Sequence, residues 1–382
     1  MKIAFLTNYI NHHQVPVADE MYKLLGNDYC FIATIPIHEW RKKLGYADFS
    51  DKPYLLKSYE SSEQLEKAIH IINEADVVII GAAPENMISE RLKENKFTFR
   101  YSERYFKSRP WYFPDPRIWL SFYKNHIRYR RKNVFMLAAS AYTANDLAHF
   151  HAYPNKVYKW GYFPKVEDFD LEASLDVSRR GRTTMLWCAR FLSWKHPELP
   201  VLLAKKLKND GYEFHIDMIG SGEKFDETFA LAKTIGVDDV VSFLGSMPND
   251  EVLQQMRKHS IFLFTSDKNE GWGAVLNESM SNGCAVVASN RIGAAPFLIE
   301  NGQNGVLFKS QDLSSLYAQV KNLLDNDEYR LSIARKAVIT MRNIWSPQNA
   351  TRRFVQFAER IMNGQDTEYT DGPCSKAYPY KG

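Results

Sequence analysis

The stretch that most constrains the fold runs from Ile261 to Ser289 and reads IFLFTSDKNEGWGAVLNESMSNGCAVVAS. It opens with a short apolar run of strand length, IFLFTS, and closes with a second one, CAVVAS. Between them, two glycines around Trp272 lead into apolar residues with helical spacing that end at Gly283. This strand, glycine loop, helix and strand predict a βαβ unit, which places a ligand crevice at the carboxyl ends of parallel strands.

Two carboxylates lie on this unit in an E-x7-E spacing. Glu270 precedes the glycines, and Glu278 lies about a turn and a half into the helix. Free amides beside Gly271 and Gly273 attract a phosphate or diphosphate, while a carboxylate farther along can accept two hydrogen bonds from a vicinal diol such as a ribose. One ligand could satisfy both groups. The alternative is that both glutamates are solvated helix charges.

These residues resemble the motif of glycosyltransferase family 4, which reads roughly E-G-F-G-x-x-x-x-E-A-M-A-x-G-x-P-V, against E-G-W-G-A-V-L-N-E-S-M-S-N-G-C-A-V here. The matching positions are both glutamates, both early glycines, Met280, Gly283 and Val286, and the departures are Trp272, Ser279, Ser281 and Ala285. The family consists of retaining transferases that use nucleotide-diphosphate sugars. The resemblance implies that Glu270 orients the donor sugar, that Glu278 holds the ribose, and that Gly271, Trp272 and Gly273 contact the donor.

The resemblance also implies an α/β GT-B architecture with two Rossmann-like, doubly wound domains, a central cleft and a C-terminal helix that crosses back to the first domain. The chain has 382 residues, which favours two domains. We expect an acceptor domain over residues 1–164, a linker over 165–182, and a nucleotide-sugar domain over 183–345. The returning helix is expected over 346–362, and a polar, disordered tail over 363–382.

Two cations follow the strand TTMLWCA, which begins the second domain. Arg190 and Lys195 match an arginine and a lysine with which the family binds the donor diphosphate, although His196 stands where the family usually has glycine. An arginine fork and a lysine point charge at a strand end can neutralise the charge on a departing diphosphate. Together with Glu270, these cations are the expected catalytic residues.

Three further residues complete the expected donor site. Gly220 and Gly222 form a short turn after the strand FHIDMI, where glycine lets the backbone approach a ligand. Met247 lies in a stretch where family members shape the nucleobase pocket, and a core methionine is the alternative.

The acceptor-side candidates are His12, His13 and Glu103. The two histidines lie in the loop after the strand KIAFLT, and an exposed polar turn is the alternative. Glu103 ends the strand FTFRYS, where an acid could orient or deprotonate an acceptor hydroxyl. A salt bridge from Glu103 to Arg100, Arg104 or Lys107 is the competing interpretation.

Residues 93–132 are the most distinctive stretch outside the family motif. They contain twelve Lys or Arg and twelve aromatic residues, against three acidic residues. This composition suits the headgroup zone of an anionic membrane, where a polyprenyl-diphosphate acceptor would lie. The competing interpretation is a helix whose aromatic residues pack inward. No recognised nucleic-acid module surrounds these residues, so nucleic-acid binding is not expected.

The sequence therefore predicts a glycosyltransferase that uses a UDP- or GDP-linked sugar and a glycan or polyprenyl-diphosphate-linked acceptor in bacterial capsule, exopolysaccharide or lipopolysaccharide synthesis. No metal or other cofactor is expected, because cations and amides take the metal's place. The four cysteines lack metal-ligand spacing and no apolar run spans a bilayer, so we expect a cytoplasmic protein, peripheral on the inner face of the membrane. The alternatives are a nucleotide-sugar epimerase and a non-catalytic nucleotide-sugar-binding protein.

Overall fold

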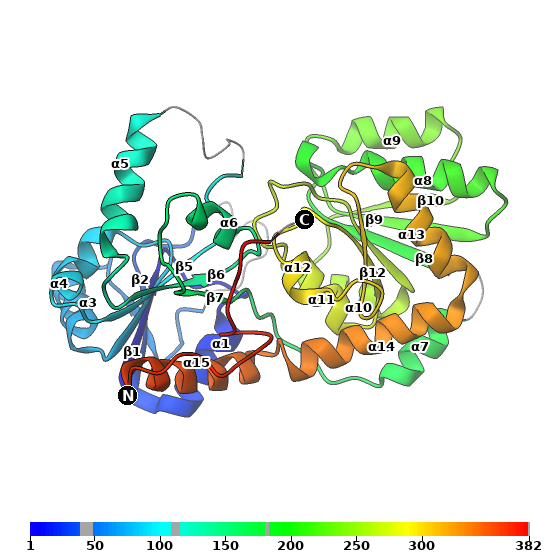
Figure 1. The fold of residues 1–382 in the computed structure, drawn as a ribbon. Helices are drawn as coiled ribbons and strands as arrows, with labels where there is room; N and C mark the ends of the chain where they lie inside the picture. Colours follow the sequence, from blue (N-terminus) through cyan, green and yellow to red (C-terminus); the bar gives the residue numbers. More distant parts are fainter. Residues whose placement is uncertain (39–48, 108–114, 180–182, 381–382) are drawn as a thin grey trace. The chain divides into compact units, whose positions relative to one another are not determined.

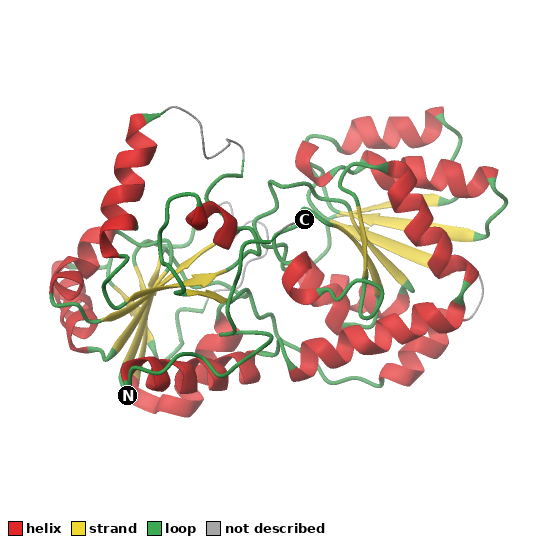
Figure 2. Ribbon diagram, in the orientation of Figure 1, coloured by secondary structure: helices red, strands yellow, loops and turns green. Residues whose placement is uncertain are grey.

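The computed structural model describes residues 1–38, 49–107, 115–179 and 183–380. The chain divides into two compact units. Unit 1 comprises Met1–Lys165 and Trp345–Lys381, and unit 2 comprises Val166–Ile344. Each unit contains one parallel sheet with helices on both of its faces (Figure 1, Figure 2). The expected GT-B fold class is confirmed.

The sheet of unit 1 has the strand order β3-β2-β1-β4-β5-β6-β7. Its inner strands are continuous apolar runs that are buried along their length, as expected for a sheet covered on both faces. The strands are β1 Ile3–Thr7, β2 Tyr29–Ala33, β3 Leu55–Lys57, β4 Val77–Ile80, β5 Phe97–Ser102, β6 Val134–Ala138 and β7 Val157–Lys159. The described α-helices before the second unit are α1 Val15–Leu25, α3 Ser62–Glu74, α4 Ser89–Lys93, α5 Pro116–Asn125 and α6 Thr143–Ala148.

The sheet of unit 2 has the order β10-β9-β8-β11-β12-β13. The order reverses beside β8, and such a switch point is where open α/β sheets bind ligands. The strands are β8 Thr183–Cys188, β9 Phe214–Ile219, β10 Val241–Gly245, β11 Ile261–Phe264, β12 Ala285–Ser289 and β13 Val306–Phe308. The helices are α7 Leu171–Arg179, α8 Glu198–Asn209, α9 Phe225–Thr234, α10 Asn249–Lys258, α11 Val275–Ser281, α12 Ala295–Leu298, α13 Leu313–Asp325 and α14 Asp327–Asn343. The βαβ unit predicted from residues 261–289 is β11, α11 and β12.

The last helix, α15 Pro347–Met362, returns to unit 1 and lies beside α1 (Figure 1). Its start is capped by Ser346, whose hydroxyl accepts a hydrogen bond from the amide of Asn349 at 3.3 Å. Phe354 and Phe357 on its buried face pack against Phe99 of β5, with ring centroids 5.2 and 5.6 Å apart. The expected returning helix is confirmed.

The segment expected to be a linker contains a helix. Helix α7 begins at Leu171, and Leu175 is buried in the hydrophobic core of unit 2. Ser174 donates a hydrogen bond to the carbonyl of Arg257 at 2.7 Å, which fixes the helix beside α10. A single short helix offers too few apolar positions for its period to stand out from the charged residues around it.

The expectation of a disordered tail is also wrong for the described residues. The tail forms an antiparallel bridge to β7 between Lys376 and Tyr158. The amide of Cys374 donates to the carbonyl of Lys159 at 2.8 Å, and the amide of Ala377 donates to the carbonyl of Val157 at 2.9 Å. The polar tail therefore covers the exposed edge of β7 through backbone groups, which composition does not reveal.

The tail can be tested at Cys374, whose side chain is fully buried. Cys374→Asp places a carboxylate in this site and should lower the free energy of unfolding by about 2–4 kcal/mol, because a buried charge without a partner is costly. Tyr378→Asp, at an exposed position of the same tail, should change it little. Urea unfolding measures both variants, and equal stability of the two would contradict a packed tail.

Candidate active site

The two expected cations lie in a loop over residues 189–197, here called the cation loop. Arg190 is exposed, and Lys195 lies in a single 3₁₀ turn. The hydroxyl of Thr265, just after β11, donates to the carbonyl of Lys195 at 2.6 Å and accepts from the indole of Trp187 at 2.9 Å. The amide of Asp267 donates to the carbonyl of Trp194 at 2.9 Å. These bonds hold the cation loop against residues 265–274, here called the acid loop.

Lys195 and Glu270 form an ion pair across these two loops. Their side chains are only 12% and 14% exposed, so both charges have lost most of their water. The amide of Glu270 donates to the carbonyl of Asp267 at 3.1 Å, which fixes the turn that carries the carboxylate. The structure thus brings together a predicted cation and a predicted acid that lie 75 residues apart in the sequence.

Glu278 lies at the same end of the sheet. It is 7% exposed, and its burial raises the pKa of its carboxyl to about 7, although a hydrogen bond from Asn249 acts in the opposite direction. Burial raises the pKa of the Cys188 thiol at the end of β8 to about 12, with a further rise from Glu278 and a reduction from Lys195. Glu278 and Lys195 therefore both lie close to the carboxyl end of β8, and neither predicted acid points into bulk water.

The predicted glycines allow close backbone packing around this end of the sheet. Gly220 and Gly222 have φ angles of +135° and +149°, and a Cβ on Gly220 would lie 1.9 Å from the carbonyl oxygen of Ala189. The amide of Phe191 donates to the carbonyl of Ser221 at 2.9 Å. The turn after β9 is therefore packed directly on the cation loop, as a donor-binding turn would be.

The acid loop also requires a glycine, at position 273. Gly273 has a φ of +88°, and a Cβ there would lie 2.7 Å from the ring of Phe264. Trp272 differs from the expectation of a donor contact, because its side chain is fully buried and its indole donates to Asn277 at 2.8 Å. Any contact of Trp272 with a ligand is therefore limited to its backbone.

Met247 lies between β10 and α10 and is half-buried. The neighbouring Ser246 donates to the hydroxyl of Ser221 at 2.8 Å, and the amide of Gly220 donates to the carbonyl of Gly245 at 2.8 Å. These bonds place the loop that carries Met247 beside the Gly220 turn.

The three acceptor-side candidates form a cluster in unit 1. Glu103 pairs with Lys107 and accepts a hydrogen bond from the hydroxyl of Tyr162 at 2.8 Å. The ring of Tyr162 stacks on His13 with centroids 5.8 Å apart, and the rings of His12 and His13 lie 3.8 Å apart. Sequence reasoning missed Tyr162, because a single tyrosine after a short strand carries no motif. The salt bridge weighed as an alternative for Glu103 is also present.

The basic, aromatic segment divides into an inward and an outward part, with residues 108–114 outside the described residues. The rings of Tyr105 and Phe106 each contact the ring of Phe122. Exposed apolar side chains lie on α5, namely Trp119 at 41%, Leu120 at 53% and Tyr123 at 55%. Over the part of the chain that the structure describes, no helix combines the length and apolar character needed to span a bilayer.

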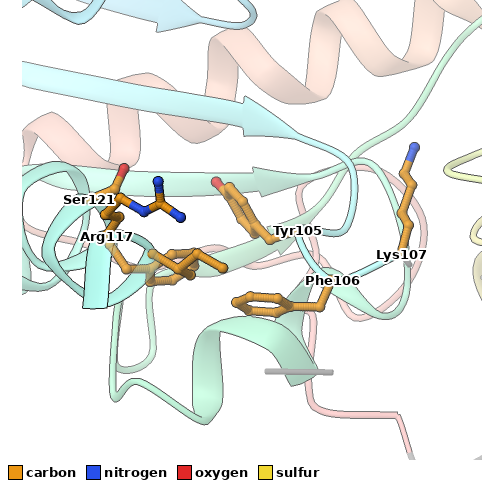
Figure 3. A pocket seen from close by; sticks show the side chains of 7 residues that line it. Tyr105, Phe106, Lys107, Arg117 and Ser121 are labelled. Atoms are coloured by element: carbon orange, nitrogen blue, oxygen red, sulfur yellow. The ribbon is translucent and has the colours of Figure 1, made fainter. Parts of the chain in front are cut away.

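A pocket of about 560 Å³ lies at this segment. Figure 3 shows the rings of Tyr105 and Phe106 in the pocket, with Arg117 on one side and Lys107 on the other. Among the described residues, it is lined by Tyr105, Phe106, Lys107, Arg117, Ile118, Ser121 and Phe122. The pocket is thus lined by rings and bordered by cations, and Lys107 connects it to Glu103.

Comparison with known proteins supports the interpretation of unit 2. Residues 176–338 match the family model described as "Glycosyl transferases group 1". A D-inositol 3-phosphate glycosyltransferase from Corynebacterium kroppenstedtii is 28% identical over 160 residues, which cover 41% of this chain and 33% of that protein. The chain thus spans about a third of the length of this curated relative.

A second relative, from Campylobacter jejuni, is 27% identical over 172 residues and covers 45% of each chain. It is an N-acetylgalactosamine-N,N'-diacetylbacillosaminyl-diphospho-undecaprenol 4-alpha-N-acetylgalactosaminyltransferase. Among solved structures, Anabaena HepE in complex with UDP has a TM-score of 0.68 at 14% identity and covers 93% of this chain and 99% of its own. HepE in complex with UDP-glucose has a TM-score of 0.63 at 15% identity and the same coverage.

The family match covers the cation loop, the Gly220 turn and the acid loop, and the likeness of fold covers nearly the whole chain. Residues 176–338 therefore match the group 1 glycosyltransferases, and the two parallel α/β sheets have the GT-B fold.

Proposed function

We propose that this protein transfers a sugar, with retention of anomeric configuration, from a UDP- or GDP-linked donor to a hydroxyl of a glycan or lipid-linked acceptor. The observation that carries the proposal is the ion pair of Lys195 and Glu270 beside the buried Glu278, in the segment that matches the family. This family match favours transfer over the epimerase alternative. A nucleotide-sugar donor is consistent with the UDP-glucose complex of HepE.

The donor would bind at the carboxyl ends of β8 and β11. Arg190 is exposed and Lys195 is mostly shielded from water, so the two cations could contact the diphosphate from its outer and inner sides. The diphosphate would compete with Glu270 for the Lys195 ammonium. Glu278 would accept hydrogen bonds from the two ribose hydroxyls, which favours its charged form over the neutral acid.

In the proposed reaction, the bond between the anomeric carbon and the diphosphate oxygen breaks, and a bond to the acceptor oxygen forms on the same face of the sugar. The acceptor proton goes to the departing diphosphate oxygen. Lys195 and Arg190 stabilise the negative charge on that oxygen, and Glu270 stabilises the oxocarbenium-like sugar. The protein supplies positioning and charge rather than a covalent intermediate.

The acceptor would bind in unit 1, at the cluster of Glu103, Tyr162 and His13. The Campylobacter relative is named for a diphospho-undecaprenol acceptor, which supports a lipid-linked acceptor here. The pocket beside Lys107 offers apolar rings to such a lipid, and the exposed apolar residues of α5 would contact the anionic membrane. We therefore place the protein at the inner face of the membrane, in the synthesis of a bacterial surface polysaccharide.

Lys195→Ala should reduce turnover at saturating donor by at least about 100-fold, because removing one group that stabilises charge in the transition state costs about this much. Nucleoside diphosphate released from the sugar nucleotide measures the reaction. Lys208→Ala removes an exposed lysine paired with Asp239 and should leave turnover unchanged. A near-normal rate for Lys195→Ala would refute the leaving-group role.

Turnover should also persist in a chelator, since protein cations neutralise the diphosphate in this proposal. The same release assay, run after dialysis against EDTA and again with added Mg²⁺, measures this. Loss of activity in EDTA with recovery in Mg²⁺ would show that a metal ion performs the role assigned to Lys195 and Arg190.

Glu278→Gln should remove a pH dependence from both stability and donor binding. The folded-state pKa of about 7 lies above the ordinary value of 4.5, so the neutral acid is favoured in the folded protein and the free energy of unfolding falls as pH rises between these values. The fall should be at most about 3 kcal/mol. Urea unfolding at pH 5 and pH 8 should show it in the wild type and in Glu300→Gln, an exposed control, but not in Glu278→Gln.

Donor affinity should rise with pH, whereas the free energy of unfolding falls. Affinity for UDP-glucose should rise as pH increases through about 7 in the wild type, because only the carboxylate accepts both ribose hydrogen bonds. Isothermal titration calorimetry should show about tenfold weaker binding by Glu278→Gln at pH 8. An unchanged affinity in this variant would contradict the ribose assignment.

A further inference from the structure

His196, which follows Lys195, stands where the resemblance placed glycine, and it has an unusual backbone conformation. Its φ of 51° and ψ of 57° lie in the left-handed region, which residues other than glycine rarely adopt. Its Nδ1 lies 2.8 Å from a carboxylate oxygen of Glu198, and its Nε2 lies 3.5 Å from one of Asp267. The imidazole therefore lies between two carboxylates, and the backbone of His196 is strained in this position.

The contact with Asp267 adds a side-chain link to the hydrogen bonds and the ion pair that already join the two loops of the donor site. Glu198 begins α8, directly after the cation loop, whereas Asp267 lies in the acid loop. The other oxygen of the Asp267 carboxylate accepts from the amide of Asn269 at 2.8 Å and from its side chain at 3.0 Å. The carbonyl of Asp267 accepts from the amide of Glu270 at 3.1 Å. Asp267 thus orders the turn that carries Glu270.

The cation and acid loops are therefore linked by two ionic contacts that lie one residue apart on the cation loop. The first is Lys195 with Glu270. The second is His196 with Asp267 at 3.5 Å, which is ionic when the imidazole is protonated. The first contact must break if Lys195 is to bind a donor diphosphate. The second contact involves neither Lys195 nor Glu270, so it can stay in place. The second contact can therefore support the hydrogen bonds that hold the loops together while the first is exchanged.

We propose that His196, as an imidazolium, is a positioning residue that keeps the cation loop on the acid loop while Lys195 exchanges Glu270 for the donor diphosphate. This role rests on the proposed function, in which Lys195 binds the donor diphosphate. The link between His196 and Asp267 can be tested without any ligand. His196 does not touch the reacting atoms in this proposal. It acts through Asp267 and the turn that presents Glu270.

The charges around His196 favour the imidazolium. The hydrogen bond with Glu198 raises the pKa of His196, and the carboxylate of Asp267 raises it further, although partial burial opposes them. Lys195, the preceding residue, is paired with Glu270, and Lys224 at the start of α9 interacts with Glu198. A raised pKa means that the link is complete below about 6.5 and weakens as pH rises through the folded-state pKa.

Hydrogen exchange of the free protein tests the link. Amides of peptides covering residues 190–197 and 265–271 should exchange about tenfold faster in His196→Asn than in the wild type at pH 6, because opening of the loops exposes them. Asparagine tolerates the left-handed conformation but carries no charge. His70→Asn, at an exposed histidine on α3 in unit 1, is the matched control and should match the wild type in both loops.

Lys195→Ala separates the two contacts. It should leave both loops protected while weakening the binding of UDP-glucose, whereas His196→Asn should lose protection and affinity together. UDP-glucose suits this test because its diphosphate is a diester whose charge does not change between pH 5 and pH 9. Comparing affinity in His196→Asn and the wild type at pH 6 and pH 8.5 should show a smaller difference at the higher pH.

The proposal is overturned if His196→Asn keeps the protection of the wild type in both loops, or if Lys195→Ala opens them as far as His196→Asn does. Failure of every protein, including the wild type, to bind UDP-glucose or any other sugar nucleotide would instead refute the proposed function. The exchange measurements would still decide whether His196 links the loops.

Discussion

The ion pair of Lys195 and Glu270 is the interaction on which the candidate site depends. An exposed pair of this kind contributes little to stability, and a shielded pair recovers its desolvation cost only with good geometry and further hydrogen bonds. Here both partners are mostly shielded and are presented by loops that other bonds already order. In the proposed function, the pair marks the place where an anionic donor would bind, and its contribution to the stability of the fold is small.

The sheet of unit 2 explains why these loops meet. β8 and β11 are parallel neighbours, so the loops that follow them emerge at the same edge. The turn after β9 reaches the cation loop only because Gly220 and Gly222 lack a Cβ, and Gly273 makes similar room for the ring of Phe264. Glu278 completes this edge from α11, where its burial disfavours its charge. Close backbone packing and costly buried carboxylates thus occur at one place, as is common at functional sites.

Unit 1 contributes a different kind of surface. Its cluster of Glu103, Tyr162 and His13 is held by one hydrogen bond and ring stacking rather than by glycine turns. Beside it, the basic and aromatic segment places some rings inward around a pocket and leaves others exposed on α5. The inward-packing interpretation therefore describes part of the segment, and membrane contact by its exposed part stays a proposal. The C-terminal tail closes the far edge of this sheet by pairing with β7.

The sequence by itself determined the parallel α/β class, most strand positions, the returning helix α15 and the family motif. These features follow from local apolar periodicity, from glycines at fixed spacings and from a capping serine, all of which can be read along the chain. It also identified Lys195, Glu270 and Glu278 as candidate site residues, since charged residues beside strand ends and glycines form a recognisable pattern.

Only the tertiary structure decided which of these residues touch. Strand order brings together Lys195 and Glu270, His196 and Asp267, and Tyr162 and Glu103. The buried indole of Trp272, helix α7 and the packed tail were missed for a related reason. Burial and backbone pairing are set by distant parts of the chain, whereas composition records only what each segment contains.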